Sequence, residues 1–553
     1  MKLSFLSSLI TFCIMTLSFS ACGGEEGSAN NTPPQFESST PLILQANETH
    51  YYTLKANDKE NDTLTFKLTN LPNFIHYSTP QNGELQFELI PTLNDIGSYP
   101  NIIVSVSDGK STVSTTLNLS ITATPISSIA CTYYADPING NLFNDGSEEA
   151  PWGTLASIVS NHKYMQEGSK LCLKSGDHGS PIITNYHYTQ TLTITAEIGE
   201  EPFVHTLALI NSDHITIKNL VIDGSLTTPN SNPSNKAFLL NSDSVSHHLS
   251  FNNITLKSAD DTSMWTKTDW YNKVHSGARF QGDYISVTNT LFLNTYHAVE
   301  FDGNYAYLSH STIDNFAGDA IRGNGSFSTY EYNIVRDCYI NDYAIQHDDA
   351  FQTFNLDSSD PKVKEVTLRF NKFSLFEDPI TTFVTNNNLI GNLMQGVIIT
   401  DGYADGWIVE NNLIVNDQLH GISLYGVRNS RVQNNTVIQH PHYSDIDVPR
   451  IYLDKSSKTG QLNFNNTIRN NIAGQYTTWT YASDTVFEGN IALDRTDRNS
   501  YLTSFEDYDA LNFHLKAGAS AIDAGVGLEL SDKDLDGESR VKGSQVDAGA
   551  FEF

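Results

Sequence analysis

Cysteine and basic residues are scarce in this chain of 553 residues. Five cysteines are too few for a scaffold built on disulfides. Lysine and arginine total 32 against 63 aspartates and glutamates, a formal charge of −31. Such an acidic surface disfavours nucleic acid, which binds basic patches. It still permits an anionic partner, because a local basic patch or bound calcium can reverse the field in one cleft.

Several signatures of known chemistries are also missing. The sequence contains no P-loop, no dinucleotide-binding fingerprint, no Cys/His zinc spacing and no Gly-x-Ser-x-Gly elbow. Nucleotide, zinc and serine-hydrolase chemistry are therefore disfavoured. Hydrophobic residues make up 39% of the chain, which is enough for a packed core, and the length predicts at least two domains. We expect the protein to act as a monomer.

The long apolar run lies at the start of the chain. Leu3–Phe19 follows Lys2 and is too short and too rich in serine for a membrane span. The next residues, Ser20-Ala21-Cys22-Gly23-Gly24, resemble a bacterial lipoprotein lipobox. The resemblance implies a signal peptide over 1–21, a lipid on Cys22 and an outer-membrane lipoprotein in the cell envelope. The alternative is an ordinary secretory signal, and in both cases the protein is exported.

Three cysteines remain after the signal region. Cys131 and Cys172 could pair in an oxidising compartment, and the sequence leaves open whether they do. Cys338 sits in an apolar strand and is expected to be a buried thiol.

Residues 22–34 are rich in Gly, Ser, Asn and Pro and predict a tether. Residues 35–125 contain short strands at the spacing of a small β-sandwich. Ala56-Asn57-Asp58-Lys59-Glu60-Asn61-Asp62 and Val106-Ser107-Asp108-Gly109 resemble cadherin-like, immunoglobulin-type modules of bacterial surface enzymes. Such modules often bind calcium, so Asp58 and Asp62 are weak candidate ligands. Solvated turn acids are the alternative interpretation.

Residues 126–553 are repetitive. Short apolar strands recur and each closes on an Asn-containing turn, as in Trp407–Ile414 and Val432–Ile438. Asn412 and Asn435 are 23 residues apart. A period of about 22 with strand-length apolar runs predicts a solenoid. Stacked Asn side chains favour a parallel β-helix, so we predict an all-β chain with a right-handed parallel β-helix preceded by a small β-sandwich.

Both ends of this region carry a resemblance. Tyr133–Gly140 with Pro151–Leu155, and Ala521–Gly525 with Asp532–Arg540, resemble the opening and closing segments of secreted right-handed β-helix proteins. That superfamily includes polysaccharide lyases, glycoside hydrolases, uronate epimerases and phage adhesins. The resemblance implies the architecture, because one fold serves many functions.

Polar residues interrupt the apolar pattern at matching places in five segments. Aligned on one strand, the segments place the following residues in a first column: His297, Asp319, Asp349, Gln395 and His420. A second column, three positions along, contains Glu300, Arg322 and Gln352. Side chains three apart on a strand point to opposite faces, so both columns line one groove only if the chain bends there. We interpret the columns as a candidate site.

His347-Asp348-Asp349 is the most distinctive local feature of the columns. Adjacent carboxylates are costly unless they share a proton or bind a cation. In one interpretation Asp349 and Asp319 act as acid and base on a glycosidic bond. The order Asp319, Asp348-Asp349, His420-Gly421 and Arg450-Ile451 resembles polygalacturonase-type hydrolases, although 71 residues separate Asp349 from His420, about three coils.

In the other interpretation Asp348 and Asp349 hold calcium, the ion neutralises a uronate carboxylate, and Arg322, His347 or His420 removes the C5 proton. This resembles β-helix lyases of alginate and pectin. Glu300 and Arg322 are similar to the acid and arginine of the alginate and dermatan lyase branch. The lysine expected between them is absent, and Tyr305 stands about there.

Two insertions suggest a polymeric substrate. The first, 258–278, contains the candidate sugar-binding residues Trp265, Lys267, Trp270 and Lys273. A loop that packs its own tryptophans is the alternative. The second, 439–460, contributes Arg450 and Lys455. We predict an exported enzyme acting on an acidic polysaccharide, a lyase before a polygalacturonase-like inverting hydrolase, with a non-catalytic glycan-binding surface protein as a further alternative.

Overall fold

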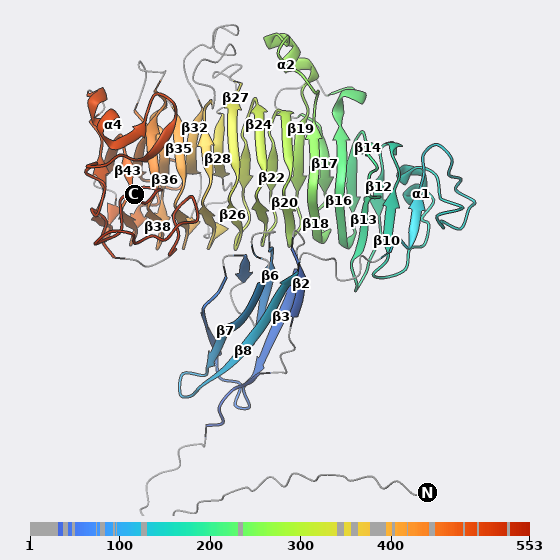
Figure 1. Cartoon of the computed structure of the whole chain (residues 1–553), viewed down its shortest axis with the longest axis horizontal. Coiled ribbons are helices and arrows are strands. Elements are labelled where there is room, and N and C mark those ends of the chain that lie inside the picture. Colours follow the sequence, from blue (N-terminus) through green and yellow to red (C-terminus); the bar gives the residue numbers. More distant parts are fainter. Residues whose placement is uncertain are drawn as a thin grey trace, which may run out of the picture. The chain divides into compact units, whose positions relative to one another are not determined.

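The structure, a computed structural model, divides into two compact units, Met1–Ile126 and Ser127–Phe553 (Figure 1). The described residues are 31–36, 42–46, 50–72, 74–77, 83–91, 95, 97–122, 130–229, 236–339, 348–354, 363–376, 394–400, 404–416, 418–441, 448–478, 482–494, 497–527 and 531–553. The predictions on Cys22 and His347 lie outside these residues.

The first unit is a β-sandwich of two four-stranded sheets, β1-β3-β6-β5 and β2-β8-β7-β4. In β3, Leu54 and Ala56 are buried while Thr53 and Lys55 are exposed, the alternation of a strand with one buried face. Both sheets contribute to one apolar core. The strands are β1 (Gln35–Phe36), β2 (Leu42–Gln45), β3 (His50–Asn57), β4 (Thr65–Thr69), β5 (Ile75–Tyr77), β6 (Glu84–Leu89), β7 (Gly97–Ser107) and β8 (Thr112–Thr122).

The second unit is a stack of coils whose strands pair in parallel with those of the next coil. One face is an 11-stranded sheet, called here the site sheet. Its strands are β12 (Ile182–Thr184), β15 (Leu207–Ile210), β17 (Phe238–Ser242), β19 (Ser276–Phe280), β22 (Val299–Phe301), β25 (Ile321–Gly323), β28 (Asp349–Phe354), β32 (Gln395–Thr400), β36 (His420–Tyr425), β40 (Arg450–Asp454) and β44 (Gln475–Thr478).

Two further stacks of strands complete each coil and share the long strands β16 (Asp213–Asp223) and β18 (His247–Lys257). The first stack contains β9 (Tyr133–Ala135), β10 (Lys170–Leu173), β13 (Leu192–Ala196), β20 (Ile285–Thr288), β23 (Tyr307–Ser309), β26 (Thr329–Glu331), β30 (Thr367–Arg369), β34 (Ile408–Glu410), β38 (Arg431–Gln433), β42 (Thr467–Arg469) and β46 (Val486–Glu488). The second contains β11 (Gly176–Asp177), β14 (Pro202–Val204), β21 (Leu291–Thr295), β24 (Thr312–Phe316), β27 (Ile334–Cys338), β31 (Lys372–Ser374), β35 (Leu413–Asn416), β39 (Thr436–Gln439), β43 (Ile472–Ala473) and β47 (Ile491–Ala492).

Short strands form a fourth, five-stranded sheet between the site sheet and the first stack. They are β29 (Val363–Lys364), β33 (Ala404–Asp405), β37 (Val427–Arg428), β41 (Asn463–Phe464) and β45 (Ala482–Ser483). Ser286, Tyr307 and Thr329 are partners in successive coils, so these coils advance by 21 and 22 residues. Parallel crossovers of this kind are right-handed. The predicted fold class, a right-handed parallel β-helix after a small β-sandwich, is confirmed.

Stacked asparagines connect six coils at the bend between the first and second stacks. Each amide Nδ2 donates to the Oδ1 of the next asparagine at 2.9–3.0 Å. The same Oδ1 also accepts the backbone N–H of the preceding asparagine. The members are Asn333, Asn371, Asn412, Asn435, Asn471 and Asn490. This asparagine ladder satisfies buried polar groups that a turn inside the core would otherwise leave unpaired.

The helices are few and short: α1 (Leu155–Ser160), α2 (Lys267–Lys273), α4 (Arg498–Ser504) and the 3-10 turn η2 (Gly224–Leu226). In the described part of the chain, none of them has the length and apolar character to cross a membrane. At the C-terminal end, α4 and the antiparallel pair β48 (Phe505–Asp507) and β49 (Asn512–Leu515) pack on a separate apolar cluster. Arg540, 1% exposed, forms an ion pair there with Glu552 at 3.0 Å.

The cysteines of the β-helix are divided as the sequence suggested. Cys131 and Cys172 form a disulfide that ties the segment before β9 to β10. Cys338, at the end of β27, is a buried free thiol. The disulfide therefore links the start of the β-helix to the second strand of the first stack.

Candidate functional site

A column of outward-facing residues crosses the site sheet. Strand register pairs Arg279 with Glu300, Glu300 with Arg322 and Arg322 with Gln352. The column continues through Ile398, Ser423, Tyr452 and Thr477. The predicted alignment of Glu300, Arg322 and Gln352 is the one that the register shows. We call these residues the outer column.

A second column lies at the corner where the chain enters the site sheet. The Nδ1 of His297 accepts the N–H of Asp319 at 2.9 Å, and Oδ1 of Asp319 accepts the N–H of Asp349 at 3.1 Å. Gln395 is the register partner of Asp349, and His420 follows in β36. In the first two links of this corner column, the side chains of His297 and Asp319 satisfy the backbone of the next coil, as the asparagines do in their ladder.

The outer column and the corner column meet on one face of the site sheet, which requires the chain to bend between them. Arg322 Nε donates to Asp319 Oδ2 at 2.6 Å, and His420 Nδ1 lies 2.7 Å from the hydroxyl oxygen of Ser423. Both contacts join residues three apart, which would diverge on a flat strand. The corner residues therefore share the surface of the outer column.

Arg322 is the centre of an ion-pair network. Its guanidinium reaches Asp319 at 2.6 Å and Glu300 at 3.3 Å. Glu300 also contacts Arg279 at 3.1 Å, and Arg279 reaches Asp302 at 2.8 Å. The Arg322 side chain is 22% exposed, whereas those of Glu300 and Asp319 are 6% and 2% exposed. In this acid–arginine centre, Arg322 is thus more accessible than its two acid partners, and Arg279 and Asp302, at 40% and 25% exposed, are accessible as well.

Burial changes the protonation of the acids and the imidazole around Arg322. Burial raises the pKa of Glu300, and its two arginine neighbours oppose that shift. Burial lowers the pKa of His297 well below its ordinary value, and the positive charge of Arg322 lowers it further. A neutral His297 that accepts through Nδ1 carries its proton on Nε2. His297 is therefore a hydrogen-bond donor through Nε2, and its Nδ1 is not free to act as a base.

Asp349 is buried without compensation. Its side chain is fully buried, and neither carboxylate oxygen has a hydrogen-bond partner among the residues that the structure describes. Burial raises the pKa of Asp349 well above its ordinary value, and the negative charges of Asp319 and Asp348 raise it further. A buried charge with no hydrogen bond is very costly. The environment therefore favours a protonated Asp349.

A second cluster lies farther along the site sheet. The ring of Tyr452 is 6.3 Å from that of His420 and 5.6 Å from that of Tyr425. The guanidinium of Arg450 lies 4.2 Å from the Tyr452 ring centre. This aromatic cluster suits contact with sugar rings.

Asp349 and His420 are two coils apart, not the three that their separation of 71 residues suggested, because the coil between β28 and β32 is long.

The first insertion differs from its predicted role. Trp270, in α2, is 1% exposed and stacks on Tyr339 at 4.6 Å, so its ring is not available to a sugar. Trp265 is half-buried against Trp270 at 5.3 Å, and Lys273 is paired with Asp269 at 2.8 Å. The loop packs its own tryptophans, which was the alternative interpretation. For Lys267 the structure describes the backbone alone.

The basic residues of the second insertion do not gather at one place. Arg450 begins β40 at the His420 end, whereas Lys455 follows the last residue of that strand. Lys455 is exposed. A single positive channel through both insertions therefore gains no support from these positions.

Calcium requires a shell of about six to eight oxygen ligands, which the predicted calcium ligands would have to supply. The two unpartnered oxygens of Asp349 suit a cation or a proton, but no carboxylates among the described residues gather within 4.8 Å as a group of three. In the sandwich, Asp58 accepts the backbone N–H of Asp62 at 2.9 Å, and Asp62 pairs with Lys110 at 2.7 Å. Calcium binding stays a prediction.

Two groups of the acid–arginine centre, Arg279 and Asp302, were not predicted from the sequence. A signal for Arg279 was present, because Ala278-Arg279-Phe280 has the same pattern as Val299-Glu300-Phe301 one coil later. Tyr305, considered in place of a catalytic lysine, lies elsewhere, stacked between Tyr284 at 4.5 Å and Phe327 at 5.1 Å.

No protein-family model and no curated protein sequence matches the chain. Among solved structures, pectate lyase Pel9A is similar at 18% identity and a TM-score of 0.34, covering 77% of this chain and 97% of that one. A GH136 lacto-N-biosidase from Eubacterium ramulus is similar at 14% identity and a TM-score of 0.34, covering 61% and 67%. An endo-fucoidan hydrolase of glycoside hydrolase family 107 is similar at 23% identity and a TM-score of 0.15.

The match to that fucoidan hydrolase covers 16% of this chain and 13% of the hydrolase. At these TM-scores the likenesses carry no weight for activity. The strand pairing establishes the fold, and the acid–arginine centre is the observation that bears on function.

Proposed function

We propose that this chain is a carbohydrate-active enzyme that cleaves a polysaccharide on the outer face of the site sheet. The observation that carries the proposal is the acid–arginine centre: a partly exposed Arg322 between buried Asp319 and Glu300, beside an Asp349 whose surroundings favour a bound proton. A passive β-helix surface needs neither a buried arginine network nor an unpartnered buried carboxyl.

A polymer has a natural path along this face. Neighbouring strands of a sheet lie about 4.8 Å apart, so the five steps from β22 to β40 span roughly 24 Å. A glycan laid across the strands would meet Arg322 at one end of this path and the rings of Tyr425 and Tyr452 toward the other. The aromatic cluster would hold the chain, and the acid–arginine centre would act on it.

β-Elimination on an acidic glycan is the first candidate reaction. In such a step a base removes the C5 proton, the bond from C4 to the leaving oxygen breaks, a C4–C5 double bond forms, and the leaving oxygen takes a proton. The guanidinium of Arg322 suits a uronate carboxylate, because it presents a planar set of donors. Asp319 and Glu300 raise the pKa of Arg322 against the opposing effect of burial, so Arg322 stays charged and serves to neutralise and not as the base.

The base must come from elsewhere. His420 lies three strands from Arg322, roughly 14 Å along the sheet, which is too far to act on the same sugar. His420 is therefore assigned to holding the substrate. Among the bases that the sequence suggested, His347 keeps this role as a proposal.

Hydrolysis is the second candidate, and one observation favours it. Asp349 favours its protonated form beside an Asp319 that is ion-paired with Arg322, and carboxyls with such different environments can divide the roles of acid and base. Both side chains are at most 2% exposed, whereas Arg322 can be reached. For this reason elimination remains first.

We also propose that the enzyme is exported and held to the bacterial outer membrane by a lipid on Cys22, where it would meet an acidic polysaccharide from outside the cell. The lipobox resemblance supports this location. Replacement of Cys22 by alanine should release the protein from the membrane fraction, and an unchanged distribution would contradict the anchor.

A panel of acidic and neutral polysaccharides tests the reaction. Products are measured by new reducing ends and by absorbance at 235 nm. Elimination raises both signals, because it cuts the chain and also creates the double bond that absorbs at 235 nm. Reducing ends without absorbance would identify the hydrolase, and binding without either signal would favour a non-catalytic glycan-binding protein.

A further inference from the structure

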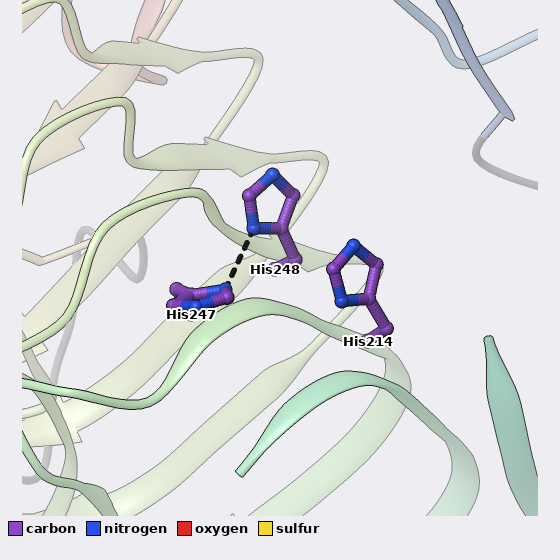
Figure 2. A group of neighbouring side chains, drawn as sticks. All are labelled: His214, His247 and His248. Carbon is purple, nitrogen blue, oxygen red and sulfur yellow. Dashed lines mark hydrogen bonds between the residues drawn. The ribbon is translucent and has the colours of Figure 1, made fainter. Parts of the chain in front are cut away.

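Three histidines meet at a corner of the β-helix, away from the acid–arginine centre (Figure 2). His214 is the second residue of β16, and His247 and His248 begin β18. The register pairs Asp213 with His247, so His214 and His248 occupy matching positions on adjacent coils. One ring nitrogen of each histidine lies within 4.8 Å of the other two.

The three rings pack closely against one another. His214 and His248 stack in parallel, with centroids 4.7 Å apart and planes at 7°. His247 stands nearly perpendicular to both. Its Nδ1 is 2.9 Å from Nδ1 of His248, and Figure 2 shows these two nitrogens facing each other.

An aromatic stack explains part of this arrangement. His214 and His248 have φ of +52°, and Tyr284, Tyr305 and Phe327 take the same left-handed conformation at this corner in later coils. Their rings stack in turn. The stack accounts for flat rings at 214 and 248. It does not account for imidazole at both positions, or for His247, which lies across the stack.

One histidine of the cluster has an oriented partner. The rings of Tyr284 and His214 stack on the ring of His248, with centroids 4.5 and 4.7 Å away. Asp213 lies 2.9 Å from Nδ1 of His214 and 2.5 Å from Nδ1 of His187. A carboxylate behind a histidine is the usual outer partner of a metal-binding imidazole.

We infer that His214, His247 and His248 form a binding site for one transition-metal ion of the Zn²⁺ class. Imidazole suits zinc, copper and nickel, whereas calcium and magnesium prefer oxygen. Three histidines leave a fourth position for water or a carboxylate, and zinc binds imidazole nitrogen at about 2.0–2.1 Å. The ion would hold the coils of β16 and β18 together, independently of the proposed glycan cleavage.

The test is titration of the untagged full-length chain, stripped with chelator, with Zn²⁺ in a calorimeter. We expect one ion per chain. His248→Phe keeps a flat ring in the stack, as Phe327 does in a later coil, but removes a ligand. His247→Ala removes the ligand outside the stack. Each change should weaken binding at least about 100-fold, the upper end of what loss of an outer partner costs.

His310→Phe is the matched control. His310 has φ of +49° and stacks on Tyr332 at 5.0 Å in another corner stack, so the change is the same at a place with no histidine cluster. This control should bind Zn²⁺ like the original chain. No stoichiometric binding, or equal affinity in His247→Ala, His248→Phe and the control, would overturn the site. Circular dichroism of each variant establishes that it is folded.

Discussion

At the scale of single residues, Asp349 differs most from what its sequence context shows. Adjacent carboxylates at 348–349 predicted a shared proton or a cation, and the raised pKa of Asp349 supports the proton. The sequence could not show that Asp349, unlike His297 and Asp319, accepts no backbone N–H from the described residues, since the N–H of its register partner Gln395 is donated to the Asp348 carbonyl. For Trp270 the sequence suggested a contact that the structure does not favour. A tryptophan in a polar loop suggested a sugar contact, yet its ring stacks on Tyr339.

The first prediction is a pH dependence of stability carried by Asp349. A carboxyl whose pKa is raised on folding stabilises the protein below its unfolded pKa of about 3.9 and loses that contribution as pH rises through the folded value. Asp349→Asn removes this loss, because the amide stays neutral. The free energy of unfolding in urea should therefore favour the variant increasingly as pH rises above about 4. Parallel curves for the two proteins would contradict a protonated Asp349.

The same variant tests function. If the reaction is hydrolysis, Asp349→Asn should lower turnover at least about 100-fold, the scale of a lost acid–base group, while the fold is retained. Asp314→Asn is the control, since it makes the same change in an aspartate that pairs with Arg336 away from the site sheet. Turnover of Asp349→Asn near that of Asp314→Asn would remove Asp349 from the mechanism.

At the scale of elements, the repeat of apolar strands and asparagine turns predicted the β-helix, because every coil must satisfy the same buried backbone groups at its turn. Recurring Asn near the turns indicated the ladder, which runs from Asn333 to Asn490. The columns could be aligned since the register follows the repeat. The bend that puts Asp319 beside Arg322 could not be predicted, because alternation alone sends such side chains apart. The histidine cluster was also missed, since its members are 33 and 34 residues apart and match no zinc spacing.

The ladder yields a stability prediction. Asn412 Nδ2 donates to Asn435 and to the Leu368 carbonyl, and its Oδ1 accepts twice from Asn371. Asn412→Ala leaves these buried groups unpaired, at about 1–3 kcal/mol each, so we expect a loss of at least about 3 kcal/mol in the free energy of unfolding. Asn465→Gly, an exposed position with φ of +53°, should change it by less than about 0.5 kcal/mol. Similar losses in both would contradict the ladder's role.

At the scale of the whole molecule, charge distinguishes acidic from neutral substrates. The chain carries −31, so an anionic polymer is repelled at long range and must be held by local cations. Ion pairs with the glycan are screened over about 8 Å at physiological salt. The Michaelis constant for an acidic polymer should therefore change markedly across a salt series, whereas a neutral polymer held by Tyr425 and Tyr452 should show little change. A flat response with an active acidic substrate would contradict the anionic-substrate proposal.

The most direct test of the central claim is the turnover of Arg322→Lys compared with Arg336→Lys on a polysaccharide that the original chain cleaves. Lysine keeps the charge but loses the planar donors that span Asp319 and a substrate carboxylate. Arg336 makes a similar two-nitrogen contact with Asp314 in the second stack, so its replacement controls for the fold. The account predicts that Arg322→Lys loses at least about 100-fold in turnover while Arg336→Lys stays near the original value. Equal turnover in the two folded variants would contradict a reacting centre at Arg322.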